Sequence, residues 1–340
     1  MNNFLFNQSG PDRDVVFSSR VRFARNVKDY PFSDRIDLPS QKELEQKILA
    51  LYDSEEFTVL PFEGLGAAEA LSYAEKLLVS PEFAAAKGPH TLVLNEKECL
   101  SVMVCEEDHI RLQCLKNGFA LDEAFEAASR EEARLDASLS FSFDDTLGYL
   151  THCPTNLGTG MRASVMLFFP AITTCGQIES VASYLSKIGL TLRGLHGEHS
   201  SPEACMFQMS NRVTLGLSEE ETLKRIKEAA SRLIEQERTL RKKLLETDPT
   251  AIRDRILRSY GIFRYAEVMS SKEFLSRYAD VRFGIAAGIL SGIDYNTVDP
   301  LLADVMPASL ICAFGERAEA DKERDLLRSA VIKSALNGQQ

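Results

Sequence analysis

Apolar residues alternate with other residues between Thr91 and Cys114, which is the spacing of strands that bury one face. The segment from Asn95 to Glu98 interrupts this alternation in the way a turn does. We therefore predict a hairpin, a loop and a further strand, all in an antiparallel sheet. The alternating apolar positions are Leu92, Leu94, Leu100, Val102, Val104, Ile110 and Leu112.

Further strands and helices are predicted on both sides of this hairpin. Ser40, with Glu43 three residues later, predicts a helix N-cap and a capping box. The stretch from Leu121 to Ala137 has the periodicity of an amphipathic helix. Its inner side is predicted to carry Leu121, Phe125, Ala128 and Leu135. The remaining expected elements are a helix over residues 66–79 and strands over residues 18–22, 164–169, 190–195 and 205–217.

The last part of the chain is predicted to be helical throughout. Ser218 and Glu221 form a second capping box, which begins a long helix that runs to about Glu246. Asp248 is then followed by Pro249, an N-cap residue before proline at the first helical position. We expect a domain boundary there, with an α+β domain of antiparallel sheet and helices over residues 1–246 and an all-helical domain over residues 247–340.

Composition narrows the class of protein. Hydrophobic residues make up 44% and charged residues 26% of the 340 positions, as in ordinary soluble globular proteins. The apolar runs are too short to span a membrane, and no secretory signal is visible at the start. Seven cysteines without a CxxC pair favour reduced thiols, so we expect a cytoplasmic location. The net charge of −11 argues against general nucleic-acid binding, which needs a basic surface.

The segment THCPTNLGTGMRASV (151–165) is the strongest chemical signal in the chain. Glycines at 158 and 160 let backbone amides approach an oxyanion, and the donor fork of Arg162 matches a phosphate bidentately. A tight turn is the simplest alternative. The chain has no GxxxxGK[ST] loop, and GTGMRA follows a proline-containing loop instead of a buried parallel strand. The two common nucleotide motifs therefore do not explain the segment.

Three other segments place arginines at expected strand ends, and the last two of them add carboxylates: SSRVR (18–22), EEDHIR (106–111) and RGLHGE (193–198). Together the four segments resemble the phosphagen kinase superfamily of ATP:guanidino phosphotransferases, and within it the bacterial protein arginine kinases. SNRVTLGLSEEE (210–221) is similar to the family's SNxxxLGxxE. The resemblance implies a phosphagen kinase-like fold and transfer of a phosphoryl group from MgATP to arginine side chains of proteins.

The resemblance also assigns roles to single residues. It implies that Glu107 and Glu198 hold the substrate guanidinium, which is protonated at neutral pH and must lose a proton as the N–P bond forms. Cys153 matches a cysteine that touches the guanidine, although a small buried cysteine is an equal alternative. Glu106 and Asp108 are expected behind these groups, or on magnesium through water. The arginines implied to clamp ATP are Arg20, Arg22, Arg111, Arg162 and Arg193.

Several features separate the chain from metabolite kinases of the superfamily. SSRVR begins at residue 18, so we expect no N-terminal helical domain of the metabolite-kinase kind. Gln208 stands where metabolite kinases usually have Asp, and Cys105 where the family usually has Asn. SSPEACM (200–206) replaces a glycine-rich substrate loop, which leaves substrate preference open. An active site left open in this way, together with an added helical domain, suits a substrate that is an arginine side chain of a protein.

In the tail, the segment from Glu323 to Ser329 resembles the phosphoarginine-binding motif RDxxRA of protein arginine kinases. Arg324 and Arg328 are four residues apart and share a helix face. They are expected to grip the phosphoryl group of phosphoarginine while Asp325 pairs with the guanidinium behind it. An ordinary helical salt-bridge pattern is the alternative.

The resemblance implies protein substrates with exposed arginine, a zinc-finger-type activator, a Clp unfoldase-protease, a homodimer and a role in the stress response. Two other functions stay open, a small-metabolite guanidino kinase and a catalytically silent phosphoarginine-binding adaptor. The histidines of HGEH (196–199) do not form the HExxH of zinc proteases, so no resident metal is expected.

Overall fold

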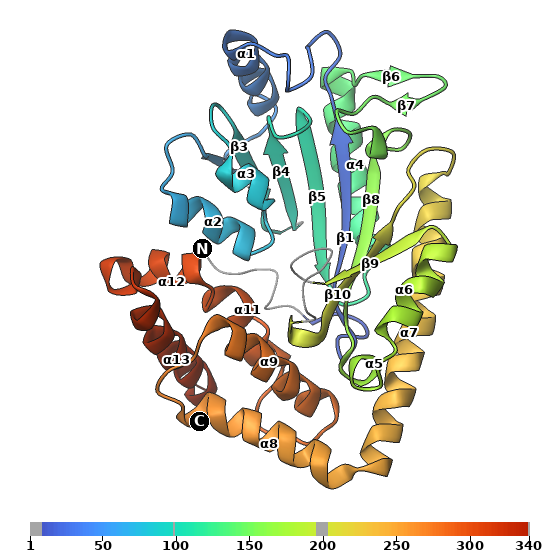
Figure 1. The fold of residues 1–340 in the computed structure, drawn as a ribbon. Coiled ribbons are helices and arrows are strands. Elements are labelled where there is room, and N and C mark those ends of the chain that lie inside the picture. The colour runs from blue at the N-terminus through green and yellow to red at the C-terminus, as the bar shows by residue number, and fades with distance from the viewer. Residues whose placement is uncertain (1–8, 98, 195–202, 339–340) are drawn as a thin grey trace.

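The computed structural model describes residues 9–97, 99–194 and 203–338. An antiparallel sheet stands at its centre, helices cover both faces of the sheet, and the C-terminal part of the chain is helical (Figure 1). This confirms the predicted α+β architecture.

Within the described residues, eight strands form the main sheet in the order β2-β3-β4-β5-β1-β8-β10-β9, and each adjacent pair is antiparallel. The predicted hairpin and the strand after it are β3, β4 and β5. The strands of this sheet are β1 (Val16–Arg25), β2 (Thr58–Pro61), β3 (Thr91–Asn95), β4 (Leu100–Val104), β5 (Ile110–Asn117), β8 (Met161–Phe168), β9 (Leu190–Gly194) and β10 (Met206–Asn211). A separate short hairpin consists of β6 (Phe143–Asp144) and β7 (Gly148–Tyr149).

Strand β10 is shorter than the predicted range of 205–217, because it ends at Asn211. The side chain of Asn211 accepts a hydrogen bond from the amide of Ala163 at 2.9 Å. It donates to the carbonyl oxygens of Met161 and Val213 at 3.1 Å each. These side-chain bonds to β8 take the place of the backbone ladder where β10 ends.

The helices follow the predicted order. The helix expected over residues 66–79 is shorter, because Leu77 adopts a left-handed φ of 62° just after its end. Before Asp248 the helices are α1 (Leu38–Leu49), α2 (Ala67–Glu75), α3 (Pro81–Ala85), α4 (Leu121–Leu139), α5 (Pro170–Thr174), α6 (Ile178–Lys187) and α7 (Glu219–Thr247). In the C-terminal part they are α8 (Pro249–Tyr265), α9 (Ser271–Ala286), α10 (Tyr295–Val298), α11 (Leu301–Asp304), α12 (Pro307–Phe314) and α13 (Asp321–Asn337). Single 3₁₀ turns are η1 (Pro154–Asn156), η2 (Glu203–Cys205) and η3 (Gly315–Ala318).

The capping residues test the predicted helix starts. Ser218 and Glu221 form both bonds of the predicted capping box, at 3.1 Å each. Asp248 caps α8 as expected, accepting from the amide of Ala251 at 3.1 Å. The prediction for Ser40 is wrong, because Asp37 is the N-cap of α1 and accepts from the amide of Ser40 at 2.8 Å. The helix begins earlier than predicted because proline is tolerated in the first turn, where its missing N–H has no intrahelical partner.

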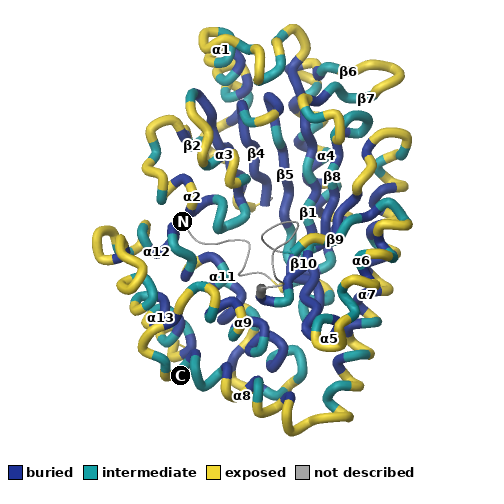
Figure 2. Tube along the Cα trace, in the orientation of Figure 1, coloured by how far each residue is buried: buried dark blue, intermediate teal, exposed yellow. Residues whose placement is uncertain are grey.

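Two apolar cores lie on opposite faces of the sheet. One packs α1, α4, α6 and α7 against the sheet, and the inner residues predicted for α4 belong to it. The other packs α2 and α3 together with the C-terminal helices, and it includes Phe17, Phe168 and Met206 from the sheet. Figure 2 shows the strands buried between these layers. Helix α7 ends and helix α8 begins on either side of Asp248, which is the predicted break between helices. The second core contains residues from both sides of this break. The division into domains of residues 1–246 and 247–340 therefore stays a prediction.

No single helix of the described residues is long and apolar enough to cross a membrane. A bent pair, Tyr295–Asp304 with Pro307–Ala318, meets the length and composition limits only when its two parts are taken together, across an angle of 85°.

Candidate active site

Strand register places the predicted arginines on one face of the sheet. Arg22 of β1 pairs with Arg162 of β8, and Ala24 pairs with Arg111 of β5. Directly paired residues and alternate residues along a strand share a face, so Arg20, Arg22, Arg111 and Arg162 project from the same side. We expected arginines at strand ends, and this is wrong for β1, whose arginines lie inside the strand.

The same face extends across β10 to β9. Gln208 pairs with Arg193 on one side and with Met166 on the other, and Met166 pairs with Ser18. Because Ser18 and Arg20 are alternate residues of β1, Arg193 lies on the arginine face too. The opposite face carries the core packed against α4 and α7.

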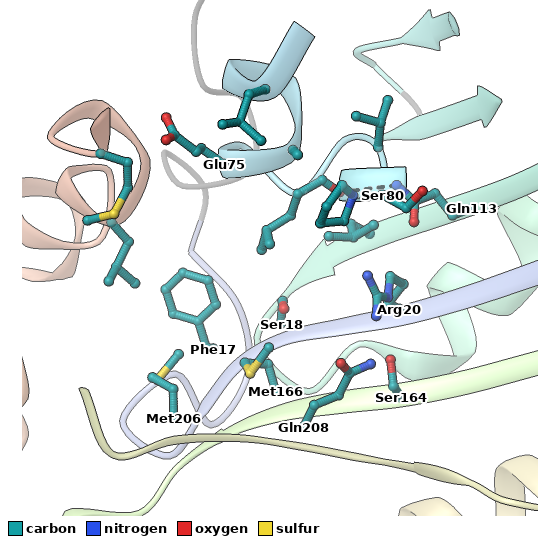
Figure 3. Close-up of a pocket in the computed structure, with 18 of the residues that line it drawn as sticks. Phe17, Ser18, Arg20, Glu75, Ser80, Gln113, Ser164, Met166, Met206 and Gln208 are labelled. Carbon is teal, nitrogen blue, oxygen red and sulfur yellow. Dashed lines mark hydrogen bonds between the residues drawn. The ribbon is translucent and has the colours of Figure 1, made fainter. Parts of the chain in front are cut away.

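A cavity of about 710 Å³ opens on this face and is lined by Arg20, Arg22 and Arg111. Figure 3 shows Arg20 and Gln113 on one side of it and Phe17 and Met206 on the other. Arg162 and Arg193 share the sheet face but are not among the residues that line the cavity. The volume falls in the range of small-molecule sites, roughly 300–1,000 Å³.

The cavity arginines are crowded and short of counterions. Burial lowers the pKa of Arg20 to about 10, and the charge of Arg111 adds to this effect. Burial, with Arg20 and Arg111 close by, holds the pKa of Arg22 well below its ordinary value. Within the described ranges, the side chains of Arg20 and Arg22 form neither a hydrogen bond nor an ion pair. A bound polyanion would relieve this repulsion, so the face is suited to phosphates.

Arg111 differs because it has a carboxylate partner. Its Nη1 atom lies 2.6 and 2.7 Å from the two carboxylate oxygens of Glu106. Ser80 also donates to Glu106, at 2.6 Å. Burial is the largest single influence on the pKa of Glu106 and would raise it, but the charge of Arg111 together with the hydrogen bonds from Arg111 and Ser80 lowers that pKa below the ordinary value. Glu106 therefore positions Arg111, and its oxygens are engaged in doing so.

Asp108 and His109 hold the loop in place. The buried carboxylate of Asp108 accepts from the side chain of Asn26 at 2.6 Å and from the amide of His152 at 2.7 Å. His109 accepts from the amide of Val27 at 3.0 Å and lies 2.9 Å from the carbonyl oxygen of Pro31, and burial lowers its pKa. These contacts tie the loop before β5 to the segment that carries Cys153.

Glu107 stands on this loop with its side chain exposed. Partial desolvation raises its pKa above the ordinary value, and the negative charge of Asp108 adds to the rise while Arg111 opposes it. A carboxylate with a raised pKa is a better proton acceptor. Glu198, the second predicted carboxylate, lies outside the described residues, as do His196 and His199.

Cys153 and Arg162 are linked through one hydroxyl group. The Sγ atom of Cys153 lies 3.0 Å from Oγ1 of Thr155, and Nη2 of Arg162 donates to the same oxygen at 3.1 Å. Arg162 also donates to the side chain of Asn156 at 3.0 Å. Burial lowers the pKa of Arg162, and Arg193 adds to this effect. The structure thus brings Cys153 beside Arg162 of the arginine face, and its contact with a substrate guanidine stays a prediction.

The glycines of the Gly-Thr-Gly turn have a packing role that the sequence did not reveal. Gly158 has a φ of 101°, and a Cβ atom there would lie 2.2 Å from the carbonyl oxygen of Thr214. Gly160 has a φ of 59°, and a Cβ atom would lie 2.4 Å from the guanidinium of Arg25. The amide of Thr159 donates to Thr214 at 3.0 Å and is therefore engaged within the protein.

In the tail, Arg324 and Arg328 lie on α13 and their donors make internal contacts. Arg328 is buried and donates to the carbonyl oxygens of Val305 at 2.9 Å and Met269 at 2.8 Å. It also pairs with Asp325 at 2.5 Å. Arg324 donates to the carbonyl oxygen of Ala318 at 2.8 Å and pairs with Asp321. Asp325 thus pairs with Arg328, and its expected pairing with the guanidinium of phosphoarginine stays a prediction.

Sequence reasoning missed the contribution of the C-terminal helices to the cavity. Lys272 and Leu275 of α9, Leu302 of α11 and Met306 line it with the sheet residues. Periodicity marks such residues as core but does not say which core they join. Ser80 was also missed, although Ser80-Pro81 is an N-cap signal.

Among the residues that the structure describes, no group of three or more His, Cys, Asp or Glu side chains is arranged to hold a metal ion.

Comparison with known families agrees with this geometry. Residues 40–240 match the family model of the ATP:guanido phosphotransferase C-terminal catalytic domain, and residues 249–340 match the protein-arginine kinase McsB C-terminal domain. The duplicated taurocyamine kinase of Schistosoma mansoni is similar in fold, with a TM-score of 0.59 and 24% identity over 80% of this chain and 40% of that one. Lombricine kinase gives a TM-score of 0.58 and 23% identity over 69% of each chain. The fold is thus that of the guanidino phosphotransferase class.

Similar sequences define the branch. The protein-arginine kinase of Brevibacillus brevis is 40% identical over 333 residues, covering 96% of this chain and 93% of the relative. The protein-arginine kinase of Halothermothrix orenii is 39% identical over 331 residues, covering 96% and 95%. The chain therefore belongs to the protein-arginine kinase family of ATP:guanido phosphotransferases.

Proposed function

We propose that the protein transfers the γ-phosphoryl group of ATP to arginine side chains of proteins. The observation that carries the proposal is the row of cationic side chains in the cavity. Arg20 and Arg22 lack a carboxylate partner within the described ranges, whereas Arg111 beside them is fixed by Glu106. Phosphoryl transfer depends mainly on positioning and charge stabilisation, which such a row supplies.

The proposed reaction uses the carboxylates as orienting groups and proton acceptors. Glu107 and Glu198 hold the substrate guanidinium, and one of them takes a proton from the attacking nitrogen. That nitrogen's electron pair forms the N–P bond, while the bond from the γ-phosphorus to the bridging oxygen breaks and ADP leaves with its electron pair. Cys153 contacts the guanidinium and acts through charge, without a covalent intermediate.

Magnesium is proposed to arrive bound to the nucleotide phosphates. It would neutralise charge on the β- and γ-phosphate oxygens. The carboxylate of Glu106 already accepts from Arg111 and Ser80, so its oxygens are a poor fit for a magnesium-bound water. The residues in the cavity thus suit a metal carried by the substrate better than one held by the protein.

A protein substrate is favoured over a free guanidine because the relatives that match over nearly their whole length are called protein-arginine kinases. The matching C-terminal domain points the same way. A free-guanidine metabolite kinase is the second candidate. A silent phosphoarginine-binding adaptor would not need Arg20, Arg22 and Arg111 gathered at one cavity.

The test is incubation with MgATP and either a casein-like protein or free arginine, followed by mass spectrometry for acid-labile phosphoarginine. Phosphoarginine on the protein supports the proposal. Consumption of free arginine alone would assign the chain to the metabolite kinases. If ATP is turned over with neither substrate, the silent phosphoarginine-binding adaptor is the remaining function.

Several partners implied by the resemblance complete the proposal. We propose a cytoplasmic homodimer that marks proteins for a Clp unfoldase-protease in the stress response and responds to a zinc-finger-type activator. None of the seven cysteines, all of which lie in the described residues, forms a disulfide, as suits a reducing compartment. In the tail, Arg324, Asp325 and Arg328 are proposed to bind phosphoarginine. This would require Asp325 to exchange its contact with Arg328 for the ligand.

A further inference from the structure

The cavity has two chemically different ends. Arg20, Arg22 and Arg111 form its cationic end. Away from Arg20, the sheet contributes Phe17, Met166 and Met206, which Figure 3 shows gathered at the other end. A triphosphate and a purine base need these two environments in one continuous site.

The spacing along β1 fits one nucleotide. Arg22 and Ser18 lie four residues apart on the same face, which is about 13 Å along a strand. An extended nucleotide spans a comparable length from its γ-phosphate to its base. Ser164, level with Arg20, and Ser18 and Gln208, level with Met166, present hydroxyl and amide groups to the cavity, and these suit the ribose hydroxyls.

The apolar end is not made by the sheet alone. Leu275 of α9, Leu302 of α11 and Met306, directly before α12, line the same cavity. Leu275 is buried in the core that crosses the chain break, and Leu302 and Met306 pack against that core. In that core the three side chains belong to the same cluster as Phe17 and Met206, so the apolar lining of the cavity comes from the sheet and the C-terminal helices together.

This wall is fixed to the catalytic part by polar contacts. The carboxylate of Glu75 in α2 accepts from the amides of Ala308 at 2.9 Å and Ser309 at 2.7 Å, at the start of α12. Arg282 of α9 is fully buried and donates to the carbonyl oxygen of Arg13 at 2.7 Å. Arg282 also bonds Asp299 at 3.0 Å. A wall held in this way is preorganised, so little ordering is needed when a ligand enters.

We propose that the C-terminal helical part is a component of the nucleotide site, in which Leu275, Leu302 and Met306 cover the purine base against Phe17, Met166 and Met206. This inference rests on the proposed function, because it takes the arginine end of the cavity as the triphosphate site. It assigns to the tail a direct share of the binding energy for ATP. Nucleotide occupancy and the packing of the tail on the sheet are then coupled.

The test compares MgATP with magnesium tripolyphosphate, which carries the phosphates without ribose or base. Both are titrated by calorimetry into the full chain and into a Leu302→Ser, Met306→Ser double variant. We expect the Kd for MgATP to rise at least about tenfold and the Kd for tripolyphosphate to change less than about twofold, because only the base loses apolar contact. Leu257→Ser, on an exposed position of α8, is the matched control and should change neither Kd.

A second variant guards against misfolding. Met306→Phe keeps the wall apolar but narrows the cavity, and it should weaken MgATP binding while tripolyphosphate binds as before. Unchanged affinity for MgATP in both wall variants, or equal loss of both ligands, would overturn the inference. Failure of the proposed function looks different: the unaltered chain would then bind neither ligand, or Arg20→Ala would leave both affinities unchanged.

Discussion

A carboxylate oxygen of Glu106 lies 2.6 Å from Nη1 of Arg111. Arg20 and Arg22, which line the same cavity, have no carboxylate partner in the described ranges. The pair is largely buried, with 6% of the Glu106 side chain and 23% of the Arg111 side chain exposed. A paired arginine keeps one orientation, whereas its neighbours can turn toward a ligand. The pair therefore gives the phosphate site one fixed point.

Glu106→Gln should lower kcat at least about tenfold while the Kd for ATP changes little, because the positive charge stays but its orientation is lost. Steady-state kinetics and calorimetry measure the two quantities. Glu126→Gln, on an exposed position of α4, is the matched control. In a double-mutant cycle with Arg111→Lys, additive losses would contradict the role of this pair.

Replacing Glu107 or Glu198 with Gln should leave ATP binding nearly intact and lower phosphorylation at least about a hundredfold, the usual scale for losing a positioned proton acceptor. Because desolvation and Asp108 raise the pKa of Glu107, it takes up its proton at a higher pH than an ordinary Glu. Base function is then lost as the pH falls through that raised pKa. The acid limb of kcat should lie above the ordinary Glu range. Unchanged turnover in the double Gln variant would remove both carboxylates from the mechanism.

Arg162→Lys or Arg193→Lys should lower phosphorylation severely, by about a hundredfold or more, since an ammonium cannot reproduce a bidentate phosphate contact. Arg162 would also lose its contacts to Thr155 and Asn156. Arg225→Lys on the exposed side of α7 is the control and should keep full activity. Near-normal rates in both site variants would make these arginines structural.

The two tail arginines should respond differently to substitution. Arg328→Ala removes the hydrogen-bond donor to two carbonyl oxygens and the ion-pair partner of Asp325. Because these groups are then left without a partner, we expect a loss of about 3 kcal/mol or more in unfolding free energy. Arg324→Ala should cost little stability but abolish binding of free phosphoarginine to the tail. Denaturant unfolding and calorimetry separate the two effects. Phosphoarginine binding that survives in Arg324→Ala would favour the plain salt-bridge interpretation of this helix.

Local sequence signals were enough to predict most elements. The alternation from Thr91 to Cys114 gave three strands, and the Ser218–Glu221 box gave the start of α7, because both depend on neighbours in sequence. The N-cap of α1 was misplaced because Asp37 and Ser40 are both good caps, and the chain between them decides which is used.

The sequence predicted the charged residues of the site but not the apolar residues that complete the cavity. The residue types of the four motifs indicate the arginines and carboxylates, and strand register then places the arginines on one face. Leu302 and Met306 carry no chemical signal, and their place beside the sheet depends on contacts over long sequence separation. The same holds for Gly158, whose need for a bare Cα comes from Thr214.

The core that crosses the break at Asp248 has a consequence for how such a chain can be divided. A fragment that ended there would turn Phe17, Phe168 and Met206 out to water, and an apolar patch of that kind invites aggregation. The tail is therefore unlike an appended cassette that recombination can exchange between enzymes. Tail and sheet have to be inherited, expressed and engineered as one unit, and a substitution tolerated on one side is constrained by the partner residues on the other.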